Sequence, residues 1–143
     1  MSAGIGNTYA SANLQQDLGS GAPATWYAQL LVSLPTAGDG TGLVQASYTG
    51  LARIPITNNS GNFPPPSVVS GVETVVVGTS VTFAIVAGLT SPITVAGIAL
   101  FDAPTGGNFG RVAAFGSWAA PVTYSLANGA QLSIAAGNLV FKE

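Results

Sequence analysis

Residues 25–34 (TWYAQLLVSL) decide the fold class of this 143-residue chain. The segment is rich in aromatic, aliphatic and β-branched side chains, and Pro35 follows directly after it. Such side chains favour a β-strand, and proline ends a strand because it has no N–H for the sheet ladder. The segment therefore predicts a strand that stops at Pro35.

Further strand-like segments follow at short intervals. They are residues 43–48, 51–56, 72–77, 80–86, 93–101, 109–118, 122–126, 131–135 and 139–141. This spacing is typical of β-sandwiches and barrels. We expect residues 72–77 and 80–86 to form a hairpin about Gly78-Thr79. Asn128-Gly129 and Gly137-Asn138 can supply the positive φ angles that hairpin turns need.

No helical pattern separates these strands, which excludes a parallel α/β fold. The prediction is an all-β protein in which residues 25–143 form an antiparallel two-sheet sandwich, and a jelly roll fits best. Residues 1–24 are rich in glycine and small polar side chains and form an N-terminal arm. Within the arm, Tyr9 to Leu18 has helical character and Gly19 is a plausible stop, so a short helix and a flexible arm are both open.

Charge is scarce along the whole chain. Three basic and five acidic side chains make up 6% of the residues, against 48% hydrophobic residues. A typical soluble domain is about 25% charged. This composition indicates a protein that lives assembled against partners. No basic cluster is present to neutralise phosphates, so we expect neither nucleic acid nor a membrane surface as a partner. The first residues carry no Lys or Arg, and we expect no secretory signal.

Catalytic chemistry finds little support in the sequence. The chain has no histidine and no cysteine, which excludes a Ser-His-Asp triad, a thiolate nucleophile and a histidine or cysteine metal site. Asp39 and Asp102 lie in glycine-rich loops, where aspartate more often caps its own backbone than forms a catalytic pair. Asn58-Asn59-Ser60 matches a glycosylation acceptor by accident. We therefore expect no enzyme activity, no cofactor and no bound metal.

Two arginines stand inside apolar strands. Arg53 and Arg111 must each pair with an acid, reach solvent or meet a partner, because an unpaired buried charge is costly. Pairing with Asp102 or Glu73 is one interpretation, and an interface anchor is the other. A stiff, proline-rich stretch, Phe63-Pro64-Pro65-Pro66, completes the candidate interface.

The order of several segments resembles one protein family. The segments are residues 26–30 (WYAQL), 48–56 (YTGLARIPI), 93–107 (ITVAGIALFDAPTGG) and 132–140 (LSIAAGNLV). Together they are similar to small tailed-bacteriophage virion proteins described as tail-fibre or head-decoration proteins. The jelly-roll cement protein of a Bordetella-infecting, short-tailed phage is one such protein.

This resemblance implies a capsid cement protein on the exterior of the virion. Such a protein binds the major capsid protein, bridges neighbouring capsomers and forms a homodimer, for which we expect edge-strand pairing. The alternative is a tail-fibre or receptor-binding head domain, which predicts a trimer. A lectin-like or carbohydrate-processing jelly roll would need convergent acids or a calcium cage, and five scattered acids support that poorly.

Overall fold

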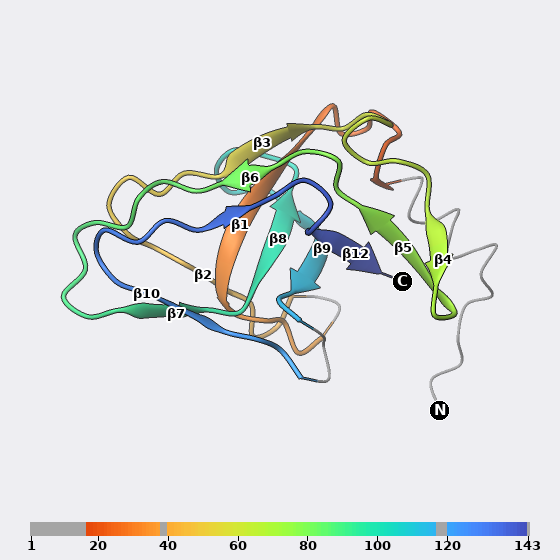
Figure 1. Ribbon diagram of the computed structural model, residues 1–143. Helices are drawn as coiled ribbons and strands as arrows, with labels where there is room; N and C mark the ends of the chain where they lie inside the picture. The colour runs from red at the N-terminus through yellow and green to blue at the C-terminus, as the bar shows by residue number, and fades with distance from the viewer. Residues whose placement is uncertain (1–16, 38–39, 117–119, 143) are drawn as a thin grey trace.

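The computed structural model describes residues 17–37, 40–116 and 120–142, and their regular structure is almost entirely β-strand (Figure 1). Every strand pair among these residues is antiparallel, which confirms the all-β, antiparallel prediction. The strands are β1 (Thr25–Ser33), β2 (Val44–Gln45), β3 (Ile54–Thr57), β4 (Ser67–Val69), β5 (Val72–Val76), β6 (Val81–Thr82), β7 (Ile93–Val95), β8 (Gly97–Phe101), β9 (Phe109–Ala114), β10 (Tyr124–Leu126), β11 (Ser133–Ile134) and β12 (Val140–Lys142).

The largest sheet is built around β1, the strand that the sequence predicts first. β8 pairs with one side of β1, and β2 and β3 pair with the other side near its two ends. β9 pairs with β8 and completes five strands. A strand with partners on both sides and covered faces needs apolar side chains in succession. This explains the nearly continuous apolar run from Ala28 to Val32.

The remaining pairs are nested about the β8–β9 hairpin. β7 pairs with β10, β6 with β11 and β5 with β12. This is the pairing order of one long hairpin that folds back over itself, and it is compatible with the predicted jelly roll. Hydrogen bonds divide the expected two layers into four sheets of five, two, two and three strands. Short irregular segments interrupt the ribbon between its strands.

The predicted hairpin about Gly78-Thr79 is wrong. β5 pairs with β4 and β12, whereas β6 pairs with β11. A two-residue hairpin turn needs positive φ, and neither Gly78 nor Thr79 has it. The chain instead runs onward, and the Gly78 N–H donates to the Asn62 carbonyl at 2.8 Å. A Cβ on Gly78 would lie 2.4 Å from the Gly61 carbonyl oxygen, so glycine permits this close approach of two backbones.

The core has two parts, one on each face of the five-stranded sheet. Leu30, Ile98 and Leu100 face the smaller sheets and join the main cluster, which includes Phe83 and Phe141. The alternate positions of β1 and β8 face the other way, since successive strand side chains point to opposite faces. There the buried side chains form a smaller second cluster, which consists of Leu31, Ala99 and Phe101.

The described end of the N-terminal arm packs against the sandwich. Most of the predicted helix, Tyr9 to Leu18, lies outside the described residues. Asp17 is helical, and Gly19 follows with φ 90°, a conformation that suits a helix stop. Leu18 is buried in the main cluster, so the core of the sandwich includes a residue from the predicted arm. No helix within the described ranges is long and apolar enough to cross a membrane.

Candidate functional site

The predicted interface residues lie in three separate places. Arg111 is on β9 beside the end of the arm, and Arg53 covers the second cluster on the opposite face of the same sheet. Phe63 to Pro66 connect β3 to β4. The structure therefore does not bring the two arginines together into one surface.

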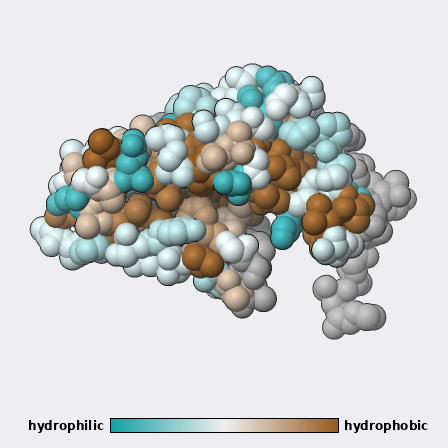
Figure 2. Space-filling model, in the orientation of Figure 1, coloured by the Kyte–Doolittle hydropathy of each residue, from teal (hydrophilic) through white to brown (hydrophobic). Residues whose placement is uncertain are grey.

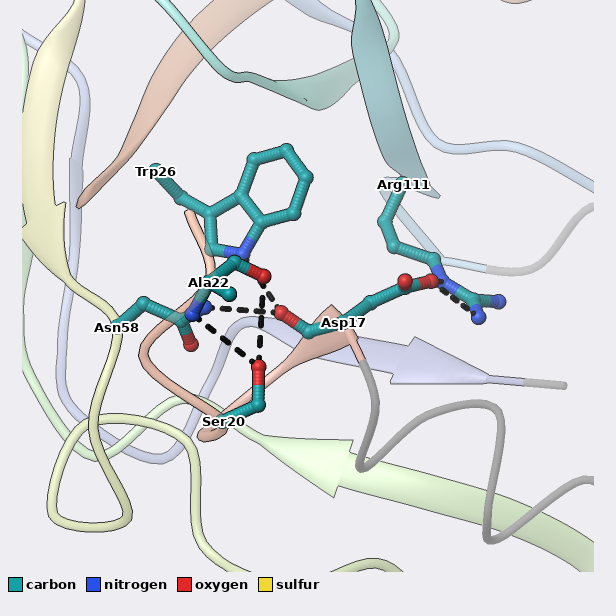
Figure 3. Close-up of polar contacts among 6 residues, drawn as sticks. All are labelled: Asp17, Ser20, Ala22, Trp26, Asn58 and Arg111. Carbon is teal, nitrogen blue, oxygen red and sulfur yellow. Dashed lines mark hydrogen bonds and ion pairs between the residues drawn. The ribbon is translucent and has the colours of Figure 1, made fainter. Parts of the chain in front are cut away.

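Arg111 pairs with the arm (Figure 3). Its Nη2 lies 2.7 Å from Oδ2 of Asp17, and its Nε–H donates to the same oxygen at 2.9 Å. The predicted pairing with an acid is formed, but Asp102 and Glu73 are not the partner. The register explains why: Arg111 lies opposite Leu100, so its side chain emerges on the inner face, where the end of the arm packs.

Asn58 holds the main chain of the same segment. Its side chain is 2% exposed, and its Nδ2 donates to the carbonyls of Asp17 at 3.0 Å and Pro23 at 2.9 Å. Its Oδ1 accepts the Gly19 N–H at 2.5 Å. Figure 3 shows Trp26 meeting Asn58 at the Asp17 carbonyl, to which the Trp26 Nε1–H donates at 2.9 Å. The Asn58 amide is fully engaged and buried, which agrees with the view that its glycosylation motif is accidental.

Phe63 is a core residue. It is 1% exposed and packs in the main cluster, so it is removed from the candidate interface residues. Between it and the end of the arm lies a hollow of about 230 Å³, which Leu18, Gly19 and Pro65 also line. Pro65 is exposed, and its two proline neighbours are half-buried. The stiff segment therefore anchors through Phe63 and presents Pro65 outward.

Arg53 clamps the turn between β8 and β9. Its Nη1 donates to the carbonyls of Ala103 at 2.6 Å and Gly106 at 2.7 Å, and its Nη2 donates to Oε1 of Gln45 at 3.2 Å. The guanidinium carbon lies 3.7 Å from the ring centroid of Phe101, which is a cation–π contact. Burial lowers the pKa of Arg53, and the nearby Asp102 charge partly offsets that effect. Arg53 thus binds carbonyls and a ring, and Asp102 contributes at longer range.

An exposed apolar patch lies on the β4–β5 hairpin, which the sequence did not predict. Val68, Val69 and Val72 are 53%, 54% and 37% exposed. Figure 2 shows apolar side chains gathered over this hairpin at one end of the molecule. Ser70 and Gly71 form the turn with φ 52° and 78°, as a tight hairpin requires. Val69 and Val72 are a cross-strand pair on one face of the hairpin, and Val68 lies on the other face. We call Val68, Val69 and Val72 the hairpin patch.

The backbone edge of β4 is poorly suited to pairing with another strand. Val69 and Val72 flank the two-residue turn as its hydrogen-bonded pair, so the next pair, Val68 with Glu73, is not bonded. Val68 therefore directs its N–H and C=O outward, and Pro66 has no N–H to add. A short edge beside a proline is typical of strands protected from edge addition. The side chains of the hairpin patch are the stronger contact feature.

Two further polar residues escaped the sequence reasoning. Gln29 is buried within the apolar run of β1, and Asn58 is the centre of the arm contacts. Gln29 carried the same signal as the arginines, a polar side chain inside an apolar strand. Asn58 gave no such signal, because its burial depends on how the arm folds over it.

The described residues contain no group of three or more acidic, histidine or cysteine side chains that could hold a metal ion.

The family model that describes the podophage GP4 fiber I protein gp80 matches residues 6–142. No curated protein matches the chain. The match covers nearly all of the chain. The chain therefore belongs to the podophage GP4 fiber I protein gp80 family, and it is a structural protein of a phage virion.

Proposed function

We propose that this protein is a fibre-type subunit on the exterior of a short-tailed phage particle, where it acts by binding other virion proteins and not by catalysis. The observation that carries the proposal is the family match over residues 6–142. The scarcity of charge supports a subunit that stays bound to neighbouring proteins, because a net charge of −2 gives little electrostatic repulsion between copies.

The hairpin patch is the proposed attachment surface. Three half-exposed valines project at one end of the molecule, on a hairpin that is joined to the other described strands by the pairing of β5 with β12. Burying the rest of each side chain against a partner contributes roughly 1 kcal/mol per valine. Both arginines are engaged within the chain by Asp17 and by the β8–β9 turn. The attachment proposed here is therefore apolar, with no arginine anchor.

Capsid cement is the second candidate function. The observation that favours it is the presence of exposed apolar side chains away from the hairpin patch, at Val44 on β2 and at Val122 and Tyr124 near β10. A subunit that bridges two capsomers needs more than one contact surface. In this role its partners are the major capsid protein and a second copy of itself.

Copy number and position in the particle decide between the two functions. Purified virions would be analysed by quantitative gel densitometry and by gold-labelled antibody against this protein. A low copy number with label confined to the tail region is expected for a fibre subunit. Label over the whole capsid, hundreds of copies and weaker shells after its removal would favour cement. Absence of the protein from purified virions would overturn both.

The attachment surface has a separate test. Val69→Ser with Val72→Ser is expected to leave the free energy of unfolding nearly unchanged, because both side chains are exposed. Incorporation into particles should fall at least tenfold. Ile85→Ser is the matched control, since Ile85 is 57% exposed but lies outside the hairpin. Equal incorporation of the double variant and the control would contradict the proposed surface.

A further inference from the structure

An open pocket with polar and apolar lining lies over the outer face of the five-stranded sheet, apart from the hairpin patch. It has a volume of about 360 Å³, within the range of small-molecule sites. Gln29, Gln45, Tyr48, Arg53 and Thr105 are among its lining residues. The pocket therefore combines groups from β1, from β2 and the β2–β3 connection, and from the β8–β9 turn.

Gln29 supplies a hydrogen-bond acceptor in the pocket. The residue is 5% exposed, and its Nε2 donates to the carbonyls of Ala46 at 3.1 Å and Leu30 at 3.3 Å. These two acceptors fix which end of the amide carries the nitrogen. Its Oε1 has no bond to any described residue. Among the described residues, every fully buried side-chain oxygen or nitrogen has a hydrogen-bond partner, so this unbonded Oε1 is not fully buried. The oxygen therefore reaches solvent, and it does so in the pocket that Gln29 lines.

Arg53 and Gln45 supply donors. A guanidinium has five N–H groups, and Arg53 uses three of them, on Ala103, Gly106 and Gln45. Nε–H and one N–H of Nη2 have no partner among the described residues. The bond from Arg53 occupies Oε1 of Gln45 and so directs its Nε2 donor away from Arg53. The cation–π contact with Phe101 holds the guanidinium in place before any ligand arrives.

The hydrogen-bonding groups of the pocket and its nearby carboxylate point to the ligand class. Asp102 lies close enough to Arg53 to act on it electrostatically, so an anionic ligand would meet a carboxylate as well as the guanidinium. The free Gln29 oxygen also needs a donor from the ligand, which a carboxylate cannot give. Hydroxyl groups both donate and accept, and thus fit the whole set. Tyr48 also lines the pocket, and its hydroxyl is already engaged, because it donates to the Ala84 carbonyl at 2.6 Å.

We propose that this pocket binds a neutral hexose unit of a saccharide. Gln29 accepts from one sugar hydroxyl, and Arg53 and Gln45 donate to others. The site is independent of how the protein attaches to the particle. Binding by the isolated protein therefore tests it even if the proposed virion role fails.

Saturation-transfer NMR on the full-length chain would test the proposal, with glucose, galactose, mannose and N-acetylglucosamine as neutral probes and glucuronate as the charged probe. At least one neutral sugar should bind with a Kd in the millimolar range, which corresponds to about −4 kcal/mol. Glucuronate should bind more weakly. Absence of transfer to every neutral sugar, or binding of glucuronate alone, would overturn the proposal.

Variants connect the signal to the pocket. Gln29→Met removes the acceptor at similar volume and should weaken binding at least tenfold. If that variant does not fold, Gln45→Ala on the exposed side of the pocket should weaken binding several-fold. Gln131→Ala is the matched control, because Gln131 bonds the Phe83 carbonyl and does not line the pocket. Unchanged affinity in the folded pocket variants would place the sugar elsewhere and refute the site.

Discussion

The carboxylate of Asp17 lies 2.7 Å from Nη2 of Arg111, although 94 positions separate the two residues in the chain. The carbonyl of the same Asp17 accepts from Trp26 and Asn58. Main chain and side chain of one residue are therefore both held by the sandwich. The boundary between arm and sandwich is a packed junction at this point.

The Asp17–Arg111 pair should contribute modestly to stability. The two side chains are 42% and 18% exposed, so we expect a coupling of about 0.5–1 kcal/mol. A double-mutant cycle of Asp17→Asn and Arg111→Met, followed by urea unfolding, measures it. The coupling should shrink at about 1 M salt, where the Debye length is about 3 Å. Zero coupling at low salt would show that the pair does not stabilise the fold.

Asn58 should matter more than the ion pair. Asn58→Ala removes the partner of the Pro23 carbonyl and of the Gly19 N–H, while the Asp17 carbonyl keeps its bond from Trp26, and we expect a loss of about 2–3 kcal/mol in the free energy of unfolding. Asn59→Ala is the matched control, because the exposed Asn59 bonds only nearby amides, at Gly61 and Asn62, through its side chain. Its cost should be about 1 kcal/mol or less. Equal losses in the two variants would contradict the central role of Asn58.

Phe63 and Pro65 should separate packing from surface presentation. Phe63→Ala removes a buried ring and should cost about 3–5 kcal/mol. Pro65→Ala, at an exposed position, should cost less than about 1 kcal/mol. Chemical denaturation of both variants provides the comparison. A well-folded Phe63→Ala protein with wild-type stability would return Phe63 to the interface candidates.

Arg53 should order the β8–β9 turn. Arg53→Met removes the bonds to Ala103 and Gly106, and we expect a loss of about 1–2 kcal/mol with faster amide exchange at Asn108, whose N–H bonds Asp102 within that turn. Arg53→Lys should not restore protection, because an ammonium cannot reproduce the planar fork. Lys142→Met, at an exposed position on β12, is the charge-matched control and should leave exchange unchanged.

Tyr48 should make stability sensitive to alkaline pH. Burial raises the pKa of its hydroxyl above the ordinary value of about 10. Since the folded value is the higher one, its contribution is full below pH 10 and is lost as the pH rises through the folded pKa. Tyr48→Phe should flatten the fall in unfolding free energy above about pH 10 and cost about 1 kcal/mol at pH 7 for the Ala84 bond. An unchanged alkaline slope would be the contrary result.

The local sequence pattern predicted the positions of the strands far better than it predicted which strands pair with each other. Residues 25–34 became β1, which ends one residue earlier. Gly129 and Gly137 adopt the expected positive φ, but the expected hairpins are wrong, because β10, β11 and β12 pair with β7, β6 and β5 and not with each other. The single strand expected over residues 93–101 is two strands, because β7 pairs with β10 while β8 joins β1 and β9. A continuous apolar run carries no mark of the point where a chain passes from one sheet to the next.

The candidate site was predictable only in part, for the same reason. An arginine inside an apolar strand signals that it needs a partner, and both arginines have one. The identity of that partner depends on contacts between distant segments, such as Asp17 with Arg111 and Ala103 with Arg53. The buried positions of Phe63 and Asn58 depend on the same packing of arm, loop and sandwich.

The nested pairing also governs how the protein can be made. Much of the native structure joins segments far apart in the chain, because β5 pairs with β12 and β6 with β11. Neither pair can form before its later strand has been synthesised. Folds with such high contact order acquire their structure slowly, since long loops must close before any contact rewards them. The ribbon cannot finish folding until residues 140–142 have been synthesised. Mature subunits should therefore appear in one late step, after translation of the last strand.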